Sequence, residues 1–535
     1  MALANIYKEE ITMEFLKLEE MTAEQKVGMV MCARRFWNDD DKNFILKLVK
    51  ERALGCMQVP LWDVEFAKKV KETADYPILL VNDSERGYPN SDRPKIPLIS
   101  LSATGNKEYM RACAKCIVAD AKADAWNGTW GPVIDILHVD GPCRVARVFS
   151  NQADKVAEYS EEIARVFNEN HFFSCGKHYP GDGAGEGVDT HMTEEFVDFT
   201  EQQVIEENLV PYIHLWKKGL LPTVMVGHST YSKIDPDRPA SLSKKCIDIF
   251  RKMGYDGVFF TDSFAMMAIL QKYGEEKLYG MAIDAGIDIV LPNYMTSVED
   301  CYNMLLKNYK DGDFSEERLN EAVRRVLKLM EFVGTEPETP LVITKEDEAM
   351  LEAIARDCIT AVCDEGVSAA LGDNDKKRLF VIITENDFEV TNAREEITID
   401  RWYYPNNIAE KIKKEFPNSE VLFLKEFPNA GDNDRTLRAA TGYDEVVFVT
   451  FCTTTCYLGT DSLTRRTEAV LNALASSKKL STIVHFGNPH ALLPVKHVPR
   501  KIFGYMIPES QEYAIDVIAG NLEAKGTLPF KIEYK

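Results

Sequence analysis

Short apolar runs alternate with longer amphipathic stretches between residues 55 and 292. The stretches between the runs have the period of amphipathic helices, for example Asn151–Asn168 and Lys244–Met253. The apolar runs are Gly55–Val59, Ile78–Val81, Trp130–Ile134, Phe172–Cys175, Thr223–Val226, Val258–Phe260 and Ile287–Leu291. This exchange of predicted strands and helices is typical of βα units that form a parallel sheet.

Polar side chains stand at the ends of several of these predicted strands. The runs end on Asn82–Asp83, Asp135, Lys177–His178, Gly227–His228 and Thr261–Asp262. In a parallel barrel such ends meet on one face, where active sites form, whereas in an open sheet they spread along a crevice. The number of polar strand ends favours the barrel. We therefore expect an α/β fold with an N-terminal TIM-type (β/α)8 barrel over residues 1–335.

A second series of apolar runs follows a segment rich in proline and acidic residues at 334–346. Helices are predicted over Lys345–Cys363, Asn406–Phe416 and Arg466–Ser476. The predicted strands are Leu379–Ile383, Val421–Leu424, Val446–Val449, Ser481–His485 and Ile502–Met506. This pattern predicts a second, open α/β domain over residues 336–535.

Length, charge and cysteine usage narrow the class of protein. The chain has 535 residues, too many for one ordinary core. Its net charge of −22 repels nucleic acid and anionic lipid, so we expect neither nucleic acid nor a membrane as a partner. No secretory signal and no apolar run of about 18 residues occur. The 12 cysteines are mostly single, as reduced thiols are, so we expect a cytoplasmic protein, and its oligomeric state stays open.

The loop Lys177–His191 combines four glycines with acidic side chains and two histidines. Asp189 lies two residues from His191, where a carboxylate can orient an imidazole for general acid/base catalysis. The alternative is an exposed pair without a role, and the residues alone give both interpretations equal weight. Asp262 ends a predicted buried strand, where it serves either as a nucleophile or as the N-cap of the next helix.

Several other chemistries lack their sequence signals. The glycines at 181, 183, 185 and 187 match neither the dinucleotide-binding fingerprint nor a P-loop, and no Gly-x-Ser-x-Gly elbow occurs. No zinc spacing relates the candidate ligands His178, Asp182, Asp189, His191 and His228. The Cys-x-x-Cys at Cys113 and Cys116 has no second pair and no nearby histidine. We therefore expect neither a metal site nor a cofactor.

Several segments together resemble glycoside hydrolase family 3, in its β-N-acetylglucosaminidase branch. The clearest is Lys177-His-Tyr-Pro-Gly-Asp-Gly followed by Asp189-Thr-His191, which looks like the signature loop of the family. Other segments similar to family motifs follow the expected order: Met21–Met29, Leu79–Gly87, Trp130–Asp135, Arg147–Phe149, Pro239–Ser243, Gly257–Met266 and Ala282–Leu291. The resemblance covers the whole chain, although its motifs all fall before residue 300.

The resemblance implies a TIM-type barrel followed by a C-terminal αβα sandwich domain. It implies Asp262 as the nucleophile and His191 as the acid/base, with Asp189 as the partner of that histidine. It also implies contacts to the sugar hydroxyls and the acetamide carbonyl from Asp83, Arg147, Lys177 and His178. The expected reaction is hydrolysis with net retention through a covalent glycosyl–aspartate, without a cofactor or metal.

The chain departs from the family pattern within these motifs. Asp182 stands where the family loop usually has a histidine, and Glu186 is a rival acid/base in the same loop. The arginine usually found eight residues after the first aspartate is Ser91, with Arg86 and Arg93 as candidate replacements. The sequence therefore constrains the reaction class more closely than the sugar specificity.

The leading prediction is a retaining exo-β-N-acetylhexosaminidase that removes terminal β-linked GlcNAc from a small oligosaccharide or glycoside. A β-N-acetylglucosaminide phosphorylase or a β-glucosidase on the same scaffold is the first alternative. Phosphorolysis is included because a histidine acid/base carries no negative charge that repels incoming phosphate. A non-catalytic sugar-binding protein is the second alternative, which the altered segment around Asp83 allows.

Overall fold

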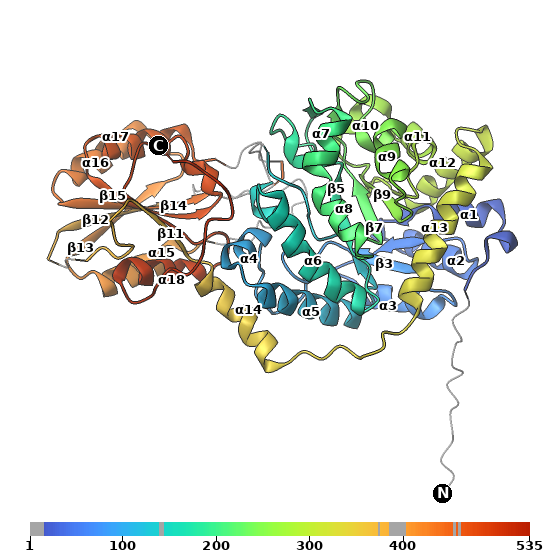
Figure 1. The fold of residues 1–535 in the computed structure, drawn as a ribbon, viewed down its shortest axis with the longest axis horizontal. Coiled ribbons are helices and arrows are strands. Elements are labelled where there is room, and N and C mark those ends of the chain that lie inside the picture. The colour runs from blue at the N-terminus through green and yellow to red at the C-terminus, as the bar shows by residue number, and fades with distance from the viewer. Residues whose placement is uncertain are drawn as a thin grey trace, which may run out of the picture.

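Two four-stranded parallel sheets form the part of the chain before residue 292. The computed structural model describes residues 15–138, 144–372, 375–384, 403–452, 456–457 and 462–534 (Figure 1). One sheet has the order β1-β2-β3-β4, formed by β1 (Cys32–Ala33), β2 (Cys56–Gln58), β3 (Leu79–Asn82) and β4 (Gly128–Thr129). The other has the order β10-β9-β7-β5, formed by β5 (Cys175–Tyr179), β7 (Thr223–Val226), β9 (Val258–Ser263) and β10 (Ile289–Leu291).

Isolated parallel bridges join these two sheets to each other. Met31, just before β1, pairs with Val290 in β10, and Gly128 in β4 pairs with Phe173, just before β5. The Phe260 ring of β9 stacks on Phe173 and meets Trp130 edge to face, so both sheets contribute to one buried aromatic cluster. Because the pairings and the bridges are all parallel, the carboxyl ends of the eight strands lie on the same side.

Amphipathic helices cover the outside of these sheets (Figure 1). In α6, for example, Val156, Ile163 and Phe167 are buried at helical spacing. The helices of this part are α1 (Ala23–Met29), α2 (Asp39–Lys50), α3 (Val64–Thr73), α4 (Leu98–Thr104), α5 (Lys107–Ala123), α6 (Ala153–Glu169), α7 (Glu201–Gln203), α8 (Val210–Lys217), α9 (Lys244–Lys252), α10 (Met267–Tyr273), α11 (Glu275–Ala285), α12 (Val298–Asp311) and α13 (Glu316–Gly334). A two-stranded sheet, β6 (Phe196–Val197) with β8 (Thr230–Tyr231), accompanies them.

A six-stranded sheet forms the rest of the chain. Its order is β11-β16-β15-β14-β12-β13, and all neighbours are parallel except β11 and β16. The strands are β11 (Thr360–Cys363), β12 (Arg378–Thr384), β13 (Ser419–Lys425), β14 (Glu445–Cys452), β15 (Leu480–Gly487) and β16 (Arg500–Phe503). Figure 1 shows α16 (Ala430–Ala440) and α17 (Arg465–Ser476) on one face of the sheet, with α15 (Pro405–Glu415) and α18 (Ser510–Ala519) on the other.

Several predicted elements differ from the structure, and one strand was not predicted. The run Trp130–Ile134 is not a strand, because the ladder uses the two preceding residues as β4 and leaves only a bridge from Val133 to Lys177. The helix predicted over Lys345–Cys363 ends early: α14 spans Lys345–Asp357, and the β-branched residues that follow pair with β16 as β11. The strand β1 was not predicted, since it has only two residues.

Helix α14 and the C-terminal segment link the six-stranded sheet to the first part of the chain. Lys115 on α5 forms an ion pair with Asp347 on α14 at 2.9 Å. The backbone N–H of Thr527 donates to Ala103 O at 2.8 Å, and Ser150 Oγ donates to Pro529 O. The two parts therefore contact each other through polar groups as well as through packed helices.

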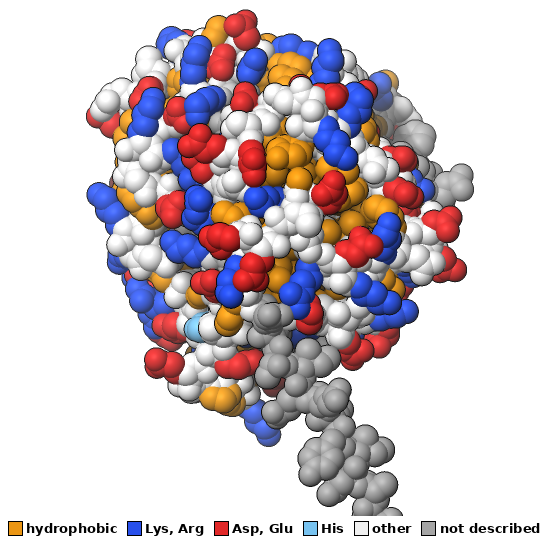
Figure 2. Space-filling view, turned by 90° about the vertical axis from the view of Figure 1, so that its right-hand side faces the viewer, with side chains coloured by type: hydrophobic (Ala, Val, Ile, Leu, Met, Phe, Trp, Pro, Cys, Tyr) orange, Lys and Arg blue, Asp and Glu red, His pale blue; other side chains and the backbone are white. Residues whose placement is uncertain are grey.

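The acidic surplus of the chain does not separate into one patch on the face that carries α1 and α12. Figure 2 shows acidic and basic side chains interspersed there, around a central group of hydrophobic side chains. The described residues of this face therefore form a mixed surface without an acidic stripe.

Candidate functional site

A cavity of about 330 Å³ lies among the carboxyl ends of the strands of both four-stranded sheets. All seven residues predicted from the sequence for the site line it: Asp83, Arg147, Lys177, His178, Asp189, His191 and Asp262. Further lining side chains include Arg34, Glu85, Trp130, Arg144, Asp182, Tyr294 and Tyr457. The strand ends that carry Asp83, Lys177–His178 and Asp262 therefore meet around one space.

Two cations and two carboxylates form a cluster on one side of the cavity. Lys177 Nζ lies 2.6 Å from Asp83 Oδ1 and 2.6 Å from Glu85 Oε1. Arg147 donates from Nε and Nη2 to both oxygens of Glu85 at 2.8 Å. Burial opposes ionisation of Glu85, but Arg147 and Lys177 outweigh it and hold the pKa of that carboxyl well below its ordinary value. The cluster holds its hydrogen-bond donors in place before any ligand arrives.

His178 connects this cluster to Asp262. Its backbone N–H donates to Asp135 Oδ1 at 2.9 Å, and its Nδ1 lies 2.8 Å from Asp135 Oδ2. This pairing fixes the imidazole and leaves Nε2 directed at the cavity, 3.3 Å from Arg147 Nη2 and 3.9 Å from Asp262 Oδ2. Asp135 is thus a support for His178.

Asp262 lies near the end of β9, with its side chain about 20% exposed. Its Oδ1 accepts a hydrogen bond from the backbone N–H of Ser263 at 2.6 Å. Burial opposes ionisation, but the imidazoles of His178, His228 and His191 outweigh it and hold the pKa of Asp262 below its ordinary value. The carboxylate is therefore ionised near neutral pH, as a nucleophile has to be.

The Asp189–His191 pair is formed within the glycine-rich loop. Asp189 Oδ1 lies 2.8 Å from His191 Nδ1 and accepts the backbone N–H of the same histidine at 2.9 Å. Backbone bonds anchor the loop beside Asp262, because Met267 N–H donates to His191 O at 3.1 Å and Ala268 N–H donates to Thr190 O at 3.2 Å. These two donors begin α10, which directly follows the strand that carries Asp262.

Asp182, which replaces a histidine of the family loop, belongs to a buried polar group beside the cavity. Ser229 Oγ lies 2.8 Å from Asp182 Oδ1 and 2.8 Å from Glu195 Oε2, and Arg144 pairs with Glu195. Burial and the negative charge of Asp182 raise the pKa of Glu195 to about 7, despite Arg144. Asp182 therefore belongs to a hydrogen-bonded group with Ser229 and Glu195 beside the cavity.

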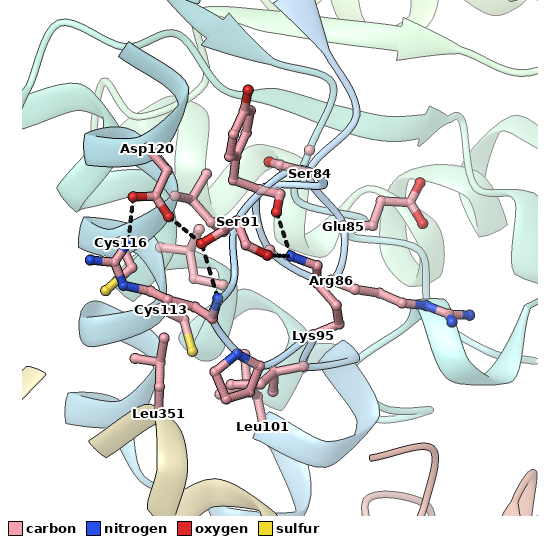
Figure 3. Close-up of a pocket in the computed structure, with 18 of the residues that line it drawn as sticks. Ser84, Glu85, Arg86, Ser91, Lys95, Leu101, Cys113, Cys116, Asp120 and Leu351 are labelled. Carbon is pink, nitrogen blue, oxygen red and sulfur yellow. Dashed lines mark hydrogen bonds and ion pairs between the residues drawn. The ribbon is translucent and has the colours of Figure 1, made fainter. Parts of the chain in front are cut away.

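The candidate replacements for the missing arginine lie outside the cavity. Ser91 Oγ donates to Asp120 Oδ2 at 2.7 Å (Figure 3). Arg93 pairs with the same carboxylate. Arg86 and Arg93 line a separate pocket of about 40 Å³ against α5. Arg34, which follows β1, lines the main cavity instead, so the proposed substitution by Arg86 or Arg93 is wrong for this cavity.

Arg34 is held by neutral acceptors. Its Nη1 donates to Ser263 Oγ at 2.6 Å and to Pro292 O at 3.0 Å, and its Nε donates to Gln58 Oε1 at 2.9 Å. Among the residues that the structure describes, no carboxylate lies within ion-pair distance of this guanidinium. Its positive charge therefore interacts electrostatically with Asp262, which lines the same cavity.

Glu186 is exposed and does not line the cavity, so the structure does not bring this rival acid/base to Asp262. The lining residues that the sequence interpretation did not name include Arg34, Glu85 and Tyr457. Glu85 lies within the Leu79–Gly87 motif and was available as a signal. Arg34 and Tyr457 lie outside every motif used, and the fold brings them to the site.

Neither a metal-holding group of side chains nor a membrane-spanning helix occurs within the described ranges. There, no group of three or more His, Cys, Asp or Glu side chains is placed to hold a metal ion. In the same part of the chain, no helix combines the length and the apolar character that a bilayer crossing requires.

Known proteins resemble this chain in sequence. The chain is 26% identical over 344 residues to a beta-N-acetylglucosaminidase/beta-glucosidase of Cellulomonas fimi, a match that covers 61% of this chain and 60% of that protein. It is 34% identical over 177 residues to a beta-hexosaminidase of Chromobacterium violaceum, covering 33% and 49% of the two chains. The matches thus span about half to three fifths of these relatives.

Solved structures share the fold over nearly the whole chain. A glycoside hydrolase family 3 beta-N-acetylglucosaminidase from Paenibacillus sp. str. FPU-7 has a TM-score of 0.76 at 22% identity, covering 96% of this chain and 99% of that one. A beta-glucoside phosphorylase reaches 0.78 at 19% identity, covering 98% and 97%. The profile of the glycosyl hydrolase family 3 N-terminal domain matches residues 18–329. Since this match covers more than half of the chain, the protein belongs to glycosyl hydrolase family 3.

Proposed function

We propose that this protein is a retaining exo-β-N-acetylhexosaminidase that hydrolyses terminal β-linked GlcNAc. One observation carries the proposal: a single cavity holds an ionised Asp262, the hydrogen-bonded Asp189–His191 pair and the Lys177–Arg147 cluster. Relatives named beta-hexosaminidase and beta-N-acetylglucosaminidase support the choice of sugar.

In the first step, the Asp262 carboxylate attacks the anomeric carbon of the sugar. The bond from that carbon to the leaving oxygen breaks, and the oxygen takes the proton from His191 Nε2. Nδ1–H of His191 donates to Asp189, which stabilises the imidazolium before transfer. In the second step, neutral His191 removes a proton from water, whose oxygen attacks the anomeric carbon and releases Asp262. Two inversions give net retention.

The glycone lies against the charged cluster. Asp83 and Lys177 contact sugar hydroxyls, because the first accepts and the second donates at the open side of the cluster. Arg147 and His178 Nε2 lie together at 3.3 Å and face the acetamide carbonyl. These assignments use donors that the cluster already orients, so little reorganisation accompanies binding.

The same proposal includes the architecture and the location. The eight parallel strands with their two connecting bridges are interpreted as a closed TIM-type barrel over residues 1–335, followed by an α/β sandwich domain over residues 336–535. The eleven described cysteines are free thiols, which fits a cytoplasmic enzyme.

A panel of aryl β-glycosides with GlcNAc, GalNAc and glucose tests the function. We expect the GlcNAc glycoside to be turned over best. A preference for glucose would identify a β-glucosidase, and no turnover of any member would identify a sugar-binding protein. His191→Ala should lose several orders of magnitude with poor leaving groups and less with activated ones, while Glu186→Ala stays near wild type. The reverse result would transfer the acid/base role to Glu186.

A β-N-acetylglucosaminide phosphorylase is the second candidate. The neutral imidazole of His191 beside the anomeric position supports it, since phosphate approaches a histidine more readily than a carboxylate. A structural neighbour is itself a beta-glucoside phosphorylase. Turnover in the presence and absence of phosphate separates the two candidates: formation of a sugar 1-phosphate would establish phosphorolysis, and an unchanged rate with free sugar would establish hydrolysis.

A further inference from the structure

Tyr457 reaches the cavity from the second part of the chain. It follows β14 of the six-stranded sheet and lines the cavity together with Cys456. Its side chain is 55% exposed. The other lining residues that the structure describes come from the part of the chain before residue 300. Through Tyr457, the part of the chain that forms the six-stranded sheet contacts His191, the candidate acid/base.

Tyr457 contacts both members of the Asp189–His191 pair. Its backbone N–H donates to Asp189 Oδ2 at 2.6 Å. Its ring lies over the His191 ring, with centroids 5.3 Å apart and planes inclined by 59°. The φ angle of Tyr457 is +69°, in the left-handed region that a residue other than glycine enters at a cost of about 1 kcal/mol. The contacts of the ring and the N–H have to sustain this conformation.

The contact completes the hydrogen bonding of Asp189. Its Oδ1 already accepts two hydrogen bonds from His191, one from Nδ1 and one from the backbone N–H. Oδ2 accepts the bond from Tyr457, so the carboxylate is held at both ends and does not rotate about its Cβ–Cγ bond. A fixed carboxylate fixes the plane of the imidazole, which in turn sets the direction of Nε2.

We propose that Tyr457 is a positioning residue, through which the six-stranded part of the chain orients the Asp189–His191 pair toward Asp262. This inference rests on the proposed function for its catalytic consequence, but not for the structural coupling itself. Tyr457 does not exchange a proton with the substrate. Without its ring, the strained backbone relaxes and the N–H leaves Asp189.

Leaving-group dependence tests the catalytic consequence. We expect Tyr457→Ala to lower kcat/KM about 10- to 100-fold for an unactivated GlcNAc glycoside, which needs proton donation, and less than about threefold for a 2,4-dinitrophenyl glycoside. Tyr457→Phe keeps the ring and the N–H and should resemble wild type. Phe427→Ala is the matched control, because Phe427 is equally exposed at 55% and does not line the cavity. Equal losses with both leaving groups would overturn the proposal.

Hydrogen exchange of the free protein gives a readout that needs no turnover. The backbone N–H groups of His191, Met192 and Thr193 are all bonded to Asp189. We expect their exchange, followed by mass spectrometry on a peptide covering residues 188–193, to be at least about fivefold faster in Tyr457→Ala and unchanged in Tyr457→Phe. Unchanged exchange in Tyr457→Ala would refute the coupling. A wild-type protein without glycosidase activity would refute the proposed function and leave this exchange result to decide the coupling.

Discussion

Glu85 is the residue on which the charged side of the cavity depends. It accepts from both Arg147 and Lys177, and its side chain is only 16% exposed. A buried ion cluster contributes little when complete, but removal of one partner leaves the others without compensation. Removal of Glu85 should therefore lower the free energy of unfolding by more than any single contact of the cluster contributes to it.

Glu85→Ala should lower the free energy of unfolding by about 3–5 kcal/mol, because the buried Lys177 and the half-buried Arg147 lose their shared carboxylate. Denaturant unfolding measures the change. Glu65→Ala is the control, since Glu65 pairs with Lys68 on the surface at 83% exposure and should cost less than about 1 kcal/mol. Equal stabilities of the two variants would contradict the role assigned to the cluster.

Glu195 should give the stability of the protein a pH dependence. Its pKa of about 7 lies above the value of an exposed glutamate, so the folded state holds a proton that the unfolded state has released. Stability therefore falls as pH rises from about 5 through 7, by on the order of 3 kcal/mol in total. Glu195→Gln keeps a neutral side chain and removes this slope. Thermal unfolding of both proteins from pH 5 to 8 measures it, and parallel curves would show that Glu195 stays ionised.

At the scale of elements, the glycines of the site loop are required by close packing. A Cβ on Gly183 would lie 2.1 Å from Ile136 O, and one on Gly185 would lie 2.1 Å from Glu195 Cδ. Gly181 and Gly187 have φ angles of +124° and +75°. The loop therefore carries Asp189 and His191 at one defined distance from the strands beneath it.

Gly183→Ala should displace this loop. We expect a loss of about 1–3 kcal/mol of stability, because a backbone carbonyl cannot yield as a side chain does. We also expect kcat/KM to fall, since the displaced loop carries the acid/base. Gly442→Ala serves as the control, because its Cβ would meet nothing nearer than Ala439 O at 3.6 Å. Wild-type activity and stability in Gly183→Ala would show that the loop has room that the structure does not indicate.

The sequence predicts elements well where burial repeats along the chain. The apolar runs that form β3, β7, β9 and β12 are strands because both faces of each run are covered. Strands β1 and β4 have two residues each, too few for a periodic signal, and β11 forms only because β16 offers it an edge.

The same distinction applies to the site. Six of the seven predicted residues lie at strand ends or within one loop, where local sequence carries a signal, and Arg147 ends a short 3-10 helix over Val145–Arg147. Arg34 and Tyr457 reach the cavity through contacts across 229 and 268 residues of sequence, to Ser263 and Asp189. These contacts follow from the three-dimensional fold, and no local sequence pattern predicts them.

At the scale of the whole molecule, α14 connects the two parts and also contacts the first. Asp347 caps this helix by accepting from the backbone N–H and the hydroxyl of Thr344, at 2.9 and 2.8 Å. The same carboxylate pairs with Lys115 on α5, and its side chain is 6% exposed. Asp347 therefore fixes both the start of the helix and its position.

Asp347→Ala should lower the free energy of unfolding by about 1–3 kcal/mol, through the lost cap and the unpaired Lys115. Glu346→Ala, at the exposed neighbouring position, should stay within about 0.5 kcal/mol of wild type. Chemical denaturation of the two variants side by side checks the difference. Indistinguishable variants would mean that α14 is held by its apolar contacts alone.

The most direct test of the central claim is covalent trapping of Asp262. Reaction with an activated 5-fluoro-β-N-acetylglucosaminyl fluoride slows the second step more than the first, so the glycosyl–enzyme accumulates. We predict that mass spectrometry locates one fluorinated sugar on Asp262, in the tryptic peptide of residues 253–272, and none in Asp262→Asn. A protein that hydrolyses aryl β-GlcNAc but carries the label on another residue, or carries no label, would contradict the account.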